Sequence, residues 1–397
     1  MAQIVLPLPD GSLQTYQVHR ASPFPLRVST PFPREVYAAA HVVADPFNAD
    51  PWGKPKVDWD KTLAFRHHLW GLGFKIAEAM DTSQRGMGFD WANAQELIRR
   101  TLSDARTVKG ADLASGAGTD HLAPFEAKTL DDVIRAYETQ AEFIEAQGGH
   151  IILMASRALA AIARSPDDYF KVYDRVLSGC RHKVILHWLG DMFDPALKGY
   201  WGSTDVAAAM DACLAIIDAH KDRIDGIKIS LLEARYEIEL RRCLPAGVKM
   251  YTGDDFNYAE LIAGDEQGFS HGLLGIFDPI APAAAAALIQ LGAGDRAGYE
   301  AILAPTVPLS RKIFESPTQY YKAGVVFLSW LNGFQDHFAM VGGMQSARSI
   351  VHYAEVFRLA HEAGLLLDPD KATQRMSHLC GLNGISQFCV LISVAEP

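Results

Sequence analysis

Short apolar runs alternate with longer amphipathic segments along most of the chain, starting near residue 37. The runs are YAAAHVVA, FKIAEAM, GADLAS, HIILMA, KVILHWL, GIKIS, GVKMYT and GFSHGLLG. Most of them precede a stretch with apolar residues at helical spacing, such as ANAQELIRRTLSDAR or DDVIRAYETQAEFIEAQ. Because β-runs and helices alternate throughout, the pattern predicts an α/β protein, a (β/α)8 TIM barrel.

A doubly wound parallel sheet is the alternative architecture. Such a sheet usually has fewer strands and a stronger phosphate-binding loop. The only comparable stretch is SGAGTDH, which contains Gly-x-Gly but lacks a third glycine and an acidic residue for a ribose. The barrel is therefore favoured, and we expect no bound cofactor.

The chain divides into three predicted regions. Residues 1–36 form an N-terminal extension, in which IVLPLPDGSLQTYQV predicts a β-hairpin. Residues 37–294 form the barrel. Residues 295–397 form a C-terminal helical region, with helices expected near 318–338 and 345–364.

Composition excludes several classes of function. The 397 residues are 49% apolar and 21% charged, with a net charge of −10, and no basic run favours nucleic acid as a partner. No signal peptide is visible, and the longest apolar runs are too short to span a membrane. The five cysteines form no CxxC pair, so we expect reduced, buried thiols in a cytoplasmic protein. They are Cys180, Cys213, Cys243, Cys380 and Cys389.

A barrel places its chemistry at the carboxyl ends of its strands. The last residues of each run, together with those that follow, predict a polar ring around a small-molecule substrate. Its members are Asp45, Asp81, Thr82, Ser83, Ser115, Ser156, Arg157, His187, Trp188, Lys228, Ser230, Thr252, Gly253, Asp254, Asp255, Ser270 and His271.

Lys228 is the most informative member of this ring, because DGIKIS places a lysine inside an apolar strand. Burial lowers the pKa of a lysine, so a neutral amine becomes available near neutral pH. A neutral amine attacks carbonyl groups and forms an iminium, which accepts electrons. The alternative is structural: Lys228 reaches solvent at the strand end or pairs with Asp254 or Asp255.

Four segments resemble one known family. They are HVVADPFNADPWGKPKVDWDKTLAF, KVILHWLGD, DGIKIS and MYTGDDFNYAELIAGDEQGFSHGLLGIFDPIAP. Over about residues 38–290 the chain resembles a divergent, uncharacterised branch of the dihydrodipicolinate synthase / N-acetylneuraminate lyase superfamily of class I aldolases. The resemblance implies a barrel enzyme of the lyase type that assembles as a homodimer or homotetramer.

The resemblance also implies roles for individual residues. Lys228 matches the lysine that forms the Schiff base, and His187 stands where the family has its catalytic tyrosine. Residues matching substrate contacts are Ser230, Gly253, Asp254, Asp255 and Ser270, to which we add the neighbouring His271.

The loop that binds the substrate carboxylate in the family falls on AMDTSQRGMG in this chain. Thr82 and Ser83 can donate hydrogen bonds there, but Asp81 brings a negative charge that Arg85 or Arg157 would have to offset. An acidic group at this place suits a hydroxyl better than a carboxylate.

Three functions are compatible with these residues. The first is a Schiff-base lyase, aldolase or dehydratase acting on a polyhydroxylated keto compound such as a keto-sugar or sugar acid, with Lys228 and His187 as catalytic residues. The second is a metal-dependent barrel isomerase or aldolase, although no HxH or HExxH spacing supports it. Its ligands would come from Asp81, His121, His187, Asp255 and His271. The third is a non-catalytic descendant that binds a small molecule.

Overall fold

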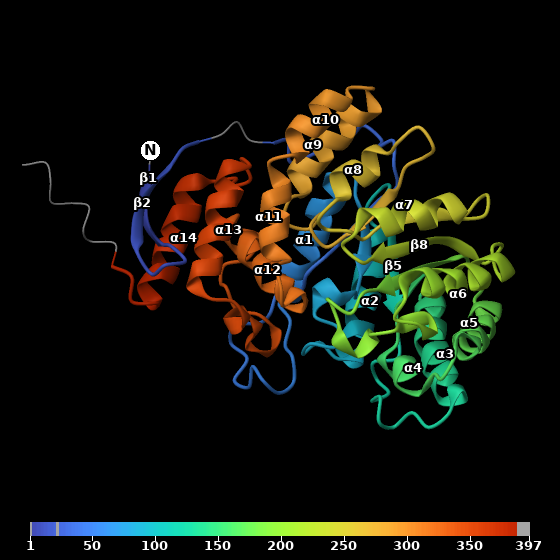
Figure 1. Ribbon diagram of the computed structural model, residues 1–397. Helices are drawn as coiled ribbons and strands as arrows, with labels where there is room; N and C mark the ends of the chain where they lie inside the picture. The colour runs from blue at the N-terminus through green and yellow to red at the C-terminus, as the bar shows by residue number, and fades with distance from the viewer. Residues whose placement is uncertain (1, 21–23, 387–397) are drawn as a thin grey trace, which may run out of the picture.

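The computed structural model describes residues 2–20 and 24–386. Eight parallel strands close into a barrel in the order β10-β3-β4-β5-β6-β7-β8-β9, and helices surround it (Figure 1). The barrel strands are β3 (Val36–Ala39), β4 (Lys75–Glu78), β5 (Leu113–Ala117), β6 (His150–Leu153), β7 (Val184–Leu189), β8 (Ile224–Ser230), β9 (Lys249–Thr252) and β10 (His271–Leu274). The predicted TIM barrel is confirmed.

Each strand leads into one or more helices along the chain, as the alternating pattern predicts. These helices are α1 (Trp59–Gly71), α2 (Trp91–Ala105), α3 (Leu130–Ala146), α4 (Arg157–Ile162), α5 (Pro166–Gly179), α6 (Val206–Ala219), α7 (Ala234–Cys243), α8 (Tyr258–Ala263) and α9 (Ala281–Gly292). Asp58 and Asp90 accept hydrogen bonds from backbone amides in the first turns of α1 and α2. Such N-caps fix where a helix begins.

The barrel interior is filled by side chains from alternate strand positions. Because successive strand residues point to opposite faces, one set faces the barrel axis and the other packs against the surrounding helices. The inward set forms its own apolar cluster, with Tyr37, Ala77, Ala114, Ile152, Ile185, Tyr251 and Leu273 among its members. Residues further along the same inward rows, towards the carboxyl ends, can reach a substrate.

The remaining helices pack beside the barrel. They are α10 (Arg296–Leu303), α11 (Thr306–Ile313), α12 (Tyr321–Leu331), α13 (Ile350–Glu362) and α14 (Pro369–Leu382). An N-terminal hairpin of β1 (Ala2–Pro7) and β2 (Leu13–Val18) lies against α13 and α14 (Figure 1). Tyr16 Oη is 2.8 Å from His361 Nδ1, and Arg358 donates to the carbonyl of Pro7 at 3.0 Å. The hairpin and the C-terminal helices therefore stabilise each other.

A buried polar chain attaches α12 to the barrel. The Nδ1 atom of His41, which follows β3, is 2.7 Å from a carboxylate oxygen of Asp278, and its Nε2 is 3.1 Å from Ser329 Oγ on α12. All three side chains are buried. Polar groups removed from water need such partners, so this chain fixes the position of α12 relative to β3.

The prediction that the cysteines are reduced and buried holds for only some of them. Cys180, Cys213 and Cys380 are buried free thiols, whereas Cys243 is free but exposed, so the prediction that all are buried is wrong there. Cys243 is the last residue of α7, where Arg242 and Cys243 are exposed although Leu240 in the same turn is buried. Cys389 lies outside the described residues. No helix in the described ranges has the length and apolar character needed to cross a bilayer.

Candidate active site

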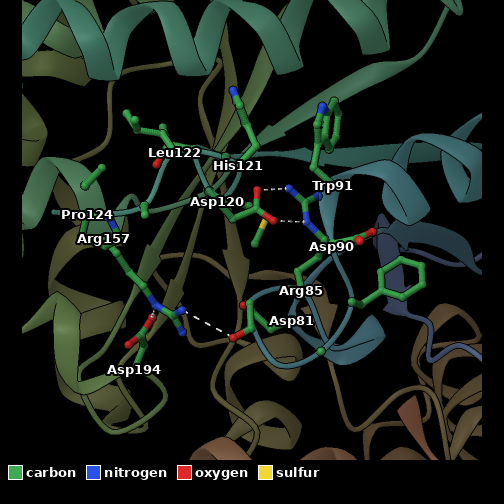
Figure 2. A pocket seen from close by; sticks show the side chains of 18 of the residues that line it. Asp81, Arg85, Asp90, Trp91, Asp120, His121, Leu122, Pro124, Arg157 and Asp194 are labelled. Atoms are coloured by element: carbon green, nitrogen blue, oxygen red, sulfur yellow. Dashed lines mark hydrogen bonds and ion pairs between the residues drawn. The ribbon is translucent and has the colours of Figure 1, made fainter. Parts of the chain in front are cut away.

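A cavity of about 980 Å³ opens at the carboxyl ends of the strands. It is lined by His187 of β7 and by the loops after β3, β4, β5, β6 and β7. Asp81, which follows β4, and Asp194, which follows β7, are among the lining residues (Figure 2). Polar lining residues are Asp50, Lys54, Asp81, Arg85, Asp90, Thr119, Asp120, His121, Arg157, His187 and Asp194. The volume is that of a ligand site, and the position is the one at which barrels carry out chemistry.

Lys228 is on the inward row of β8, next to His187, which lines the cavity. Its strand register places it directly opposite His187 of β7 and Tyr251 of β9, and its side chain is 7% exposed. Burial lowers the pKa of the Lys228 amine, while the nearby carboxylates of Asp255 and Asp81 act in the opposite direction. No ion pair of Lys228 exists within the described residues. Neither structural alternative, exposure to solvent or an ion pair, therefore describes this amine.

Gly253 provides the space that Lys228 occupies. A Cβ atom on Gly253 would lie 2.5 Å from Lys228 Cε and 2.2 Å from Ser230 Oγ. Both distances are below what real Cβ contacts show. A glycine after β9 is therefore required by the inward lysine, which gives a physical reason for one of the sequence-predicted positions.

Asp255 and Asp254 have different surroundings although they are adjacent. Asp255 accepts a hydrogen bond from the amide of Ile276 at 2.8 Å. Burial raises the pKa of Asp255 to about 7, and the Lys228 amine opposes that shift. Asp254 instead accepts from the amides of Phe256 and Asn257, which is the arrangement of a turn. Asp255 thus interacts electrostatically with Lys228, whereas Asp254 stabilises the turn after β9 through its hydrogen bonds to backbone amides.

His187 is fully buried between β6 and β8. Its Nε2 is 3.4 Å from Ser230 Oγ, and its Nδ1 has no hydrogen-bond partner among the described residues. Burial, and then the Lys228 charge, hold the pKa of His187 well below its usual range. The ring is therefore a neutral imidazole, and its lack of strong partners leaves it available to a substrate.

The loop after β4 uses most of its polar groups internally. Thr82 Oγ1 is 2.8 Å from Tyr321 Oη, and Ser83 donates to the carbonyl of Met80 at 2.7 Å. Both residues are buried. Asp81 and Arg85 are the charged members of this loop that line the cavity.

Arg85 and Arg157 both line the cavity, and both are engaged by aspartates (Figure 2). Arg85 makes a two-point ion pair with Asp120, with a distance of 2.9 Å from Nε, and it also donates to the carbonyl of Gly116. Arg157 Nε is 2.5 Å from Asp194. Each positive charge is thus already paired within the protein.

Ser270 and His271 do not belong to the site. The apolar run GFSHGLLG suggested that they end a strand, but β10 begins at His271 and ends at Leu274, so both residues lie at the amino end of the barrel. Ser270 donates to Glu237 at 2.6 Å, and His271 Nδ1 accepts from the amide of Glu35. Their predicted role as substrate contacts at the carboxyl ends is wrong, because the strand starts later than its apolar run.

The proposed set of metal ligands does not come together. His271 lies at the opposite end of the barrel, and His121 Nδ1 is 2.8 Å from the side chain of Gln140. Within residues 2–20 and 24–386, no group of three or more His, Cys, Asp and Glu side chains has metal-binding geometry. The donor set that a metal-dependent mechanism needs is not assembled here.

Two residues near the site were missed by the sequence analysis. Tyr321 and Lys322 begin α12, all of whose residues are buried, and Tyr321 contacts Thr82 as described above. The helix was predicted, but its contact with the loop after β4 joins residues 239 positions apart. A lysine at the start of the apolar segment YYKAGVVFLSWL was the available indication.

Solved structures of the dihydrodipicolinate synthase family share this fold. A dihydrodipicolinate synthase from Aquifex aeolicus aligns with a TM-score of 0.63 at 11% identity, covering 84% of this chain and 99% of that chain. A dihydrodipicolinate synthase from Bacillus anthracis aligns with a TM-score of 0.61 at 14% identity, and the alignment covers 83% of this chain and 98% of that chain. YagE, a prophage protein of that family from E. coli K12, was solved in complex with pyruvate. It aligns with a TM-score of 0.61 at 12% identity, and the alignment covers 89% of this chain and 99% of that chain.

These structural similarities confirm that the chain has the fold of the family that its sequence resembles. A search of curated proteins found no match. The family described as "protein of unknown function (DUF993)" matches residues 4–385, which agrees with a divergent, uncharacterised branch. Because the match covers the whole barrel and both extensions, the chain belongs to the DUF993 family.

Proposed function

We propose that the protein is a class I lyase that forms a Schiff base through Lys228. The observation that carries the proposal is the environment of this amine: it is inward on a barrel strand, buried, given space by Gly253, and without an ion pair to any residue that the structure describes. A buried ammonium without an ion pair is costly, so a role in chemistry explains why the chain keeps one there.

The first step follows from the state of the amine. In its neutral form Lys228 Nζ attacks the carbonyl carbon of the substrate and forms a carbinolamine. A proton from the solvent then protonates the carbinolamine hydroxyl, the C–O bond breaks, and the departing water molecule leaves an iminium ion on Nζ. The iminium accepts the electron pair of an adjacent C–C or C–H bond as that bond breaks. Asp255, coupled to Lys228, balances the positive charge of the iminium.

His187 is the group that moves the proton. It neighbours Lys228 across the β7–β8 register and lines the cavity. As a neutral imidazole it accepts a proton from the substrate and later returns it. It thereby takes the part of the family's tyrosine, with Ser230 Oγ as the nearest hydroxyl.

The proposed substrate is a polyhydroxylated keto compound, such as a keto-sugar or sugar acid. Two features support this class. The cavity of about 980 Å³ holds a molecule considerably larger than a three-carbon acid. The cavity arginines are paired with aspartates, and Asp81 faces the interior, so hydrogen-bonding hydroxyl groups fit the lining better than a free carboxylate does.

We further infer that the protein works in the cytoplasm as a homodimer or homotetramer. Support for assembly comes from large apolar side chains on the loops beside the cavity: Phe47 is 89% exposed, Trp52 76% and Phe125 77%. Apolar surface of this kind often marks an interface. Sedimentation velocity at several concentrations tests the assembly, and a monomer at every concentration would contradict it.

Schiff-base trapping tests the function. The protein is incubated with a panel of keto acids and keto-sugars, reduced with borohydride and weighed by intact-mass spectrometry. We expect a mass gain for the wild type and none for Lys228→Ala. A matched control is Lys249→Met, because Lys249 lies on the next strand but pairs with Glu35 and Asp225. No adduct with any compound in a folded wild-type protein contradicts the proposal.

A further inference from the structure

His121 is a histidine of the cavity wall with one ring nitrogen engaged and the other unengaged. It lies on the loop after β5 and follows Asp120, the partner of Arg85 (Figure 2). Its Nδ1 atom is 2.8 Å from Gln140 Nε2. Its Nε2 atom makes no hydrogen bond to any residue that the structure describes. What this ring offers to a ligand therefore depends on which nitrogen carries the proton.

The side-chain amide of Gln140 can be oriented in only one way. Gln140 lies on α3 and is fully buried. Its Oε1 atom is 2.7 Å from the backbone nitrogen of Gly118 and 2.9 Å from Arg85 Nη2, and both of these groups are donors. Its Nε2 atom is 2.8 Å from a carboxylate oxygen of Asp120, which is an acceptor. A flipped amide would set its NH2 group against two donors and its oxygen against a carboxylate.

Arg85 fixes this amide further, because every N–H group of its guanidinium has an acceptor. Nε and Nη2 donate to the two carboxylate oxygens of Asp120. Nη1 donates to the carbonyls of Ala79 and Gly116, each at 3.1 Å, and Nη2 also donates to Gln140. A guanidinium has five N–H donors, and all five are used here. Gln140 therefore cannot turn without breaking a bond to a side chain that is itself held in place.

The orientation of Gln140 decides the tautomer of His121. The Gln140 Nε2 atom only donates, so His121 Nδ1 must accept, and the ring proton lies on Nε2. A second proton on Nδ1 would set two donors against each other, which disfavours the imidazolium form. Burial also lowers the pKa of His121, while the Asp120 charge opposes this shift and the Arg85 charge adds to it.

We propose that Gln140 is a positioning residue that holds His121 in its Nε2–H tautomer, and that His121 uses this N–H group to donate a hydrogen bond to an oxygen atom of the substrate. This inference rests on the proposed function and adds a specificity-determining residue to it. A neutral donor suits a hydroxyl or carbonyl oxygen. An ammonium group at the same place of the substrate has only donors and finds no acceptor on His121.

NMR of the imidazole tests the tautomer without any ketone. The protein is labelled with 15N-histidine, the signals of His121 are assigned as those missing from His121→Gln, and the 15N shifts show which ring nitrogen carries a proton. At a pH of about 6.5 an ordinary histidine is half protonated, but we expect a neutral His121 ring with its proton on Nε2. Gln140→Met should let the ring titrate near that ordinary value. An Nδ1–H tautomer or a half-protonated ring in the wild type overturns the proposal.

Selectivity between two ketones tests the contact with the substrate. Xylulose and 1-hydroxypentan-2-one have the same carbon chain, carbonyl group and first hydroxyl, but only xylulose carries the remaining hydroxyls. Each is offered with cyanoborohydride, and the rate of adduct formation is followed by intact mass. The ratio of the two rates is compared between variants, because a general loss of folding or of Lys228 reactivity lowers both rates.

Three variants and one control are compared with the wild type. The wild type should favour xylulose, and His121→Met should lower the ratio about tenfold, because one hydrogen bond to the substrate is lost. His121→Gln should keep most of the ratio, since its amide nitrogen carries N–H donors near the place of Nε2. Gln140→Met should lower the ratio, because the ring is no longer held in one tautomer. His182→Met changes an exposed histidine and should have no effect.

The outcomes separate the two proposals. An adduct on the wild type with an unchanged ratio in His121→Met overturns the role of His121 and leaves the Schiff-base function standing. An equal fall in His121→Met and His121→Gln has the same meaning, because the amide restores the donor. No adduct on the wild type with either these ketones or the wider panel overturns both.

Discussion

Gly253 lies against Lys228 so closely that an added Cβ atom would be 2.5 Å from Lys228 Cε. We expect Gly253→Ala to displace the lysine side chain, to abolish borohydride trapping and to lower the free energy of unfolding by about 1–3 kcal/mol, as overpacking does. Urea denaturation and intact-mass trapping measure the two effects. Gly71→Ala is the control, since nothing lies within 4 Å of its added Cβ atom. Normal trapping by Gly253→Ala would show that the space is not needed.

The pH dependence of trapping should reveal the lowered pKa of Lys228. The neutral amine is the reactive form, so the trapping rate should rise with pH through a midpoint below the ordinary lysine value of about 10.4. Asp255→Asn removes a carboxylate that favours the charged amine, so it should shift this midpoint to lower pH. A shift to higher pH would contradict the assigned coupling. Asp265→Asn, on a loop at the amino end of β10, should leave the midpoint unchanged.

His187 should affect proton transfer more than Schiff-base formation. We expect His187→Phe to keep the borohydride adduct but to slow the exchange of the ketone's α-protons for deuterium about 100-fold, the usual contribution of a positioned acid–base group. Proton NMR in deuterated buffer follows the exchange. His182→Gln provides an exposed histidine control. If exchange in His187→Phe matched the wild type, another residue would have to move the proton.

Glu237 should make the protein less stable in alkali. Burial raises the pKa of this carboxyl to about 8, against hydrogen bonds from Ser270 and Thr252 that lower it. Because the folded value lies above the unfolded one, the stabilising contribution is present below about pH 4.3 and is lost as the pH rises to about 8.

Glu237→Gln should therefore reduce the loss of stability between pH 5 and pH 9, by an amount on the order of 1–3 kcal/mol. Urea unfolding at the two pH values measures it. Glu239→Gln changes an exposed residue of the same helix and should behave like the wild type. Equal pH dependence in Glu237→Gln and the wild type would mean that this carboxyl group does not titrate as proposed.

The barrel could be predicted from the sequence because its pattern is local. Each strand is a short apolar run and most of the helices that follow have apolar residues at helical spacing, so the repeat itself indicates the fold. Lys228 could be found for the same reason: an ionisable residue in an apolar run is visible without knowledge of its neighbours. The start of β10 could not be placed, since GFSHGLLG begins at Gly268, whereas the pairing begins at His271.

The rest of the site depends on contacts between distant segments. Nothing in the sequence shows that Arg85 pairs with Asp120, which removes it from the candidates for binding a substrate charge. The position of α12 is the clearest case, because its contact with the loop after β4 is made across most of the barrel sequence. Periodicity predicts a helix there but does not determine which surface it covers.

The hairpin at the start of the chain packs on α13 and α14, and these helices pack on α12, which carries Lys322. Packing contacts therefore link the first strands, through α13, α14 and α12, to the loop after β4. Anyone engineering this protein should treat the amino-terminal segment as part of the folded unit that holds the candidate site. A shortened barrel expressed alone would lose the support that keeps α12 against Thr82, and fusion partners are better attached through a linker that leaves β1 paired.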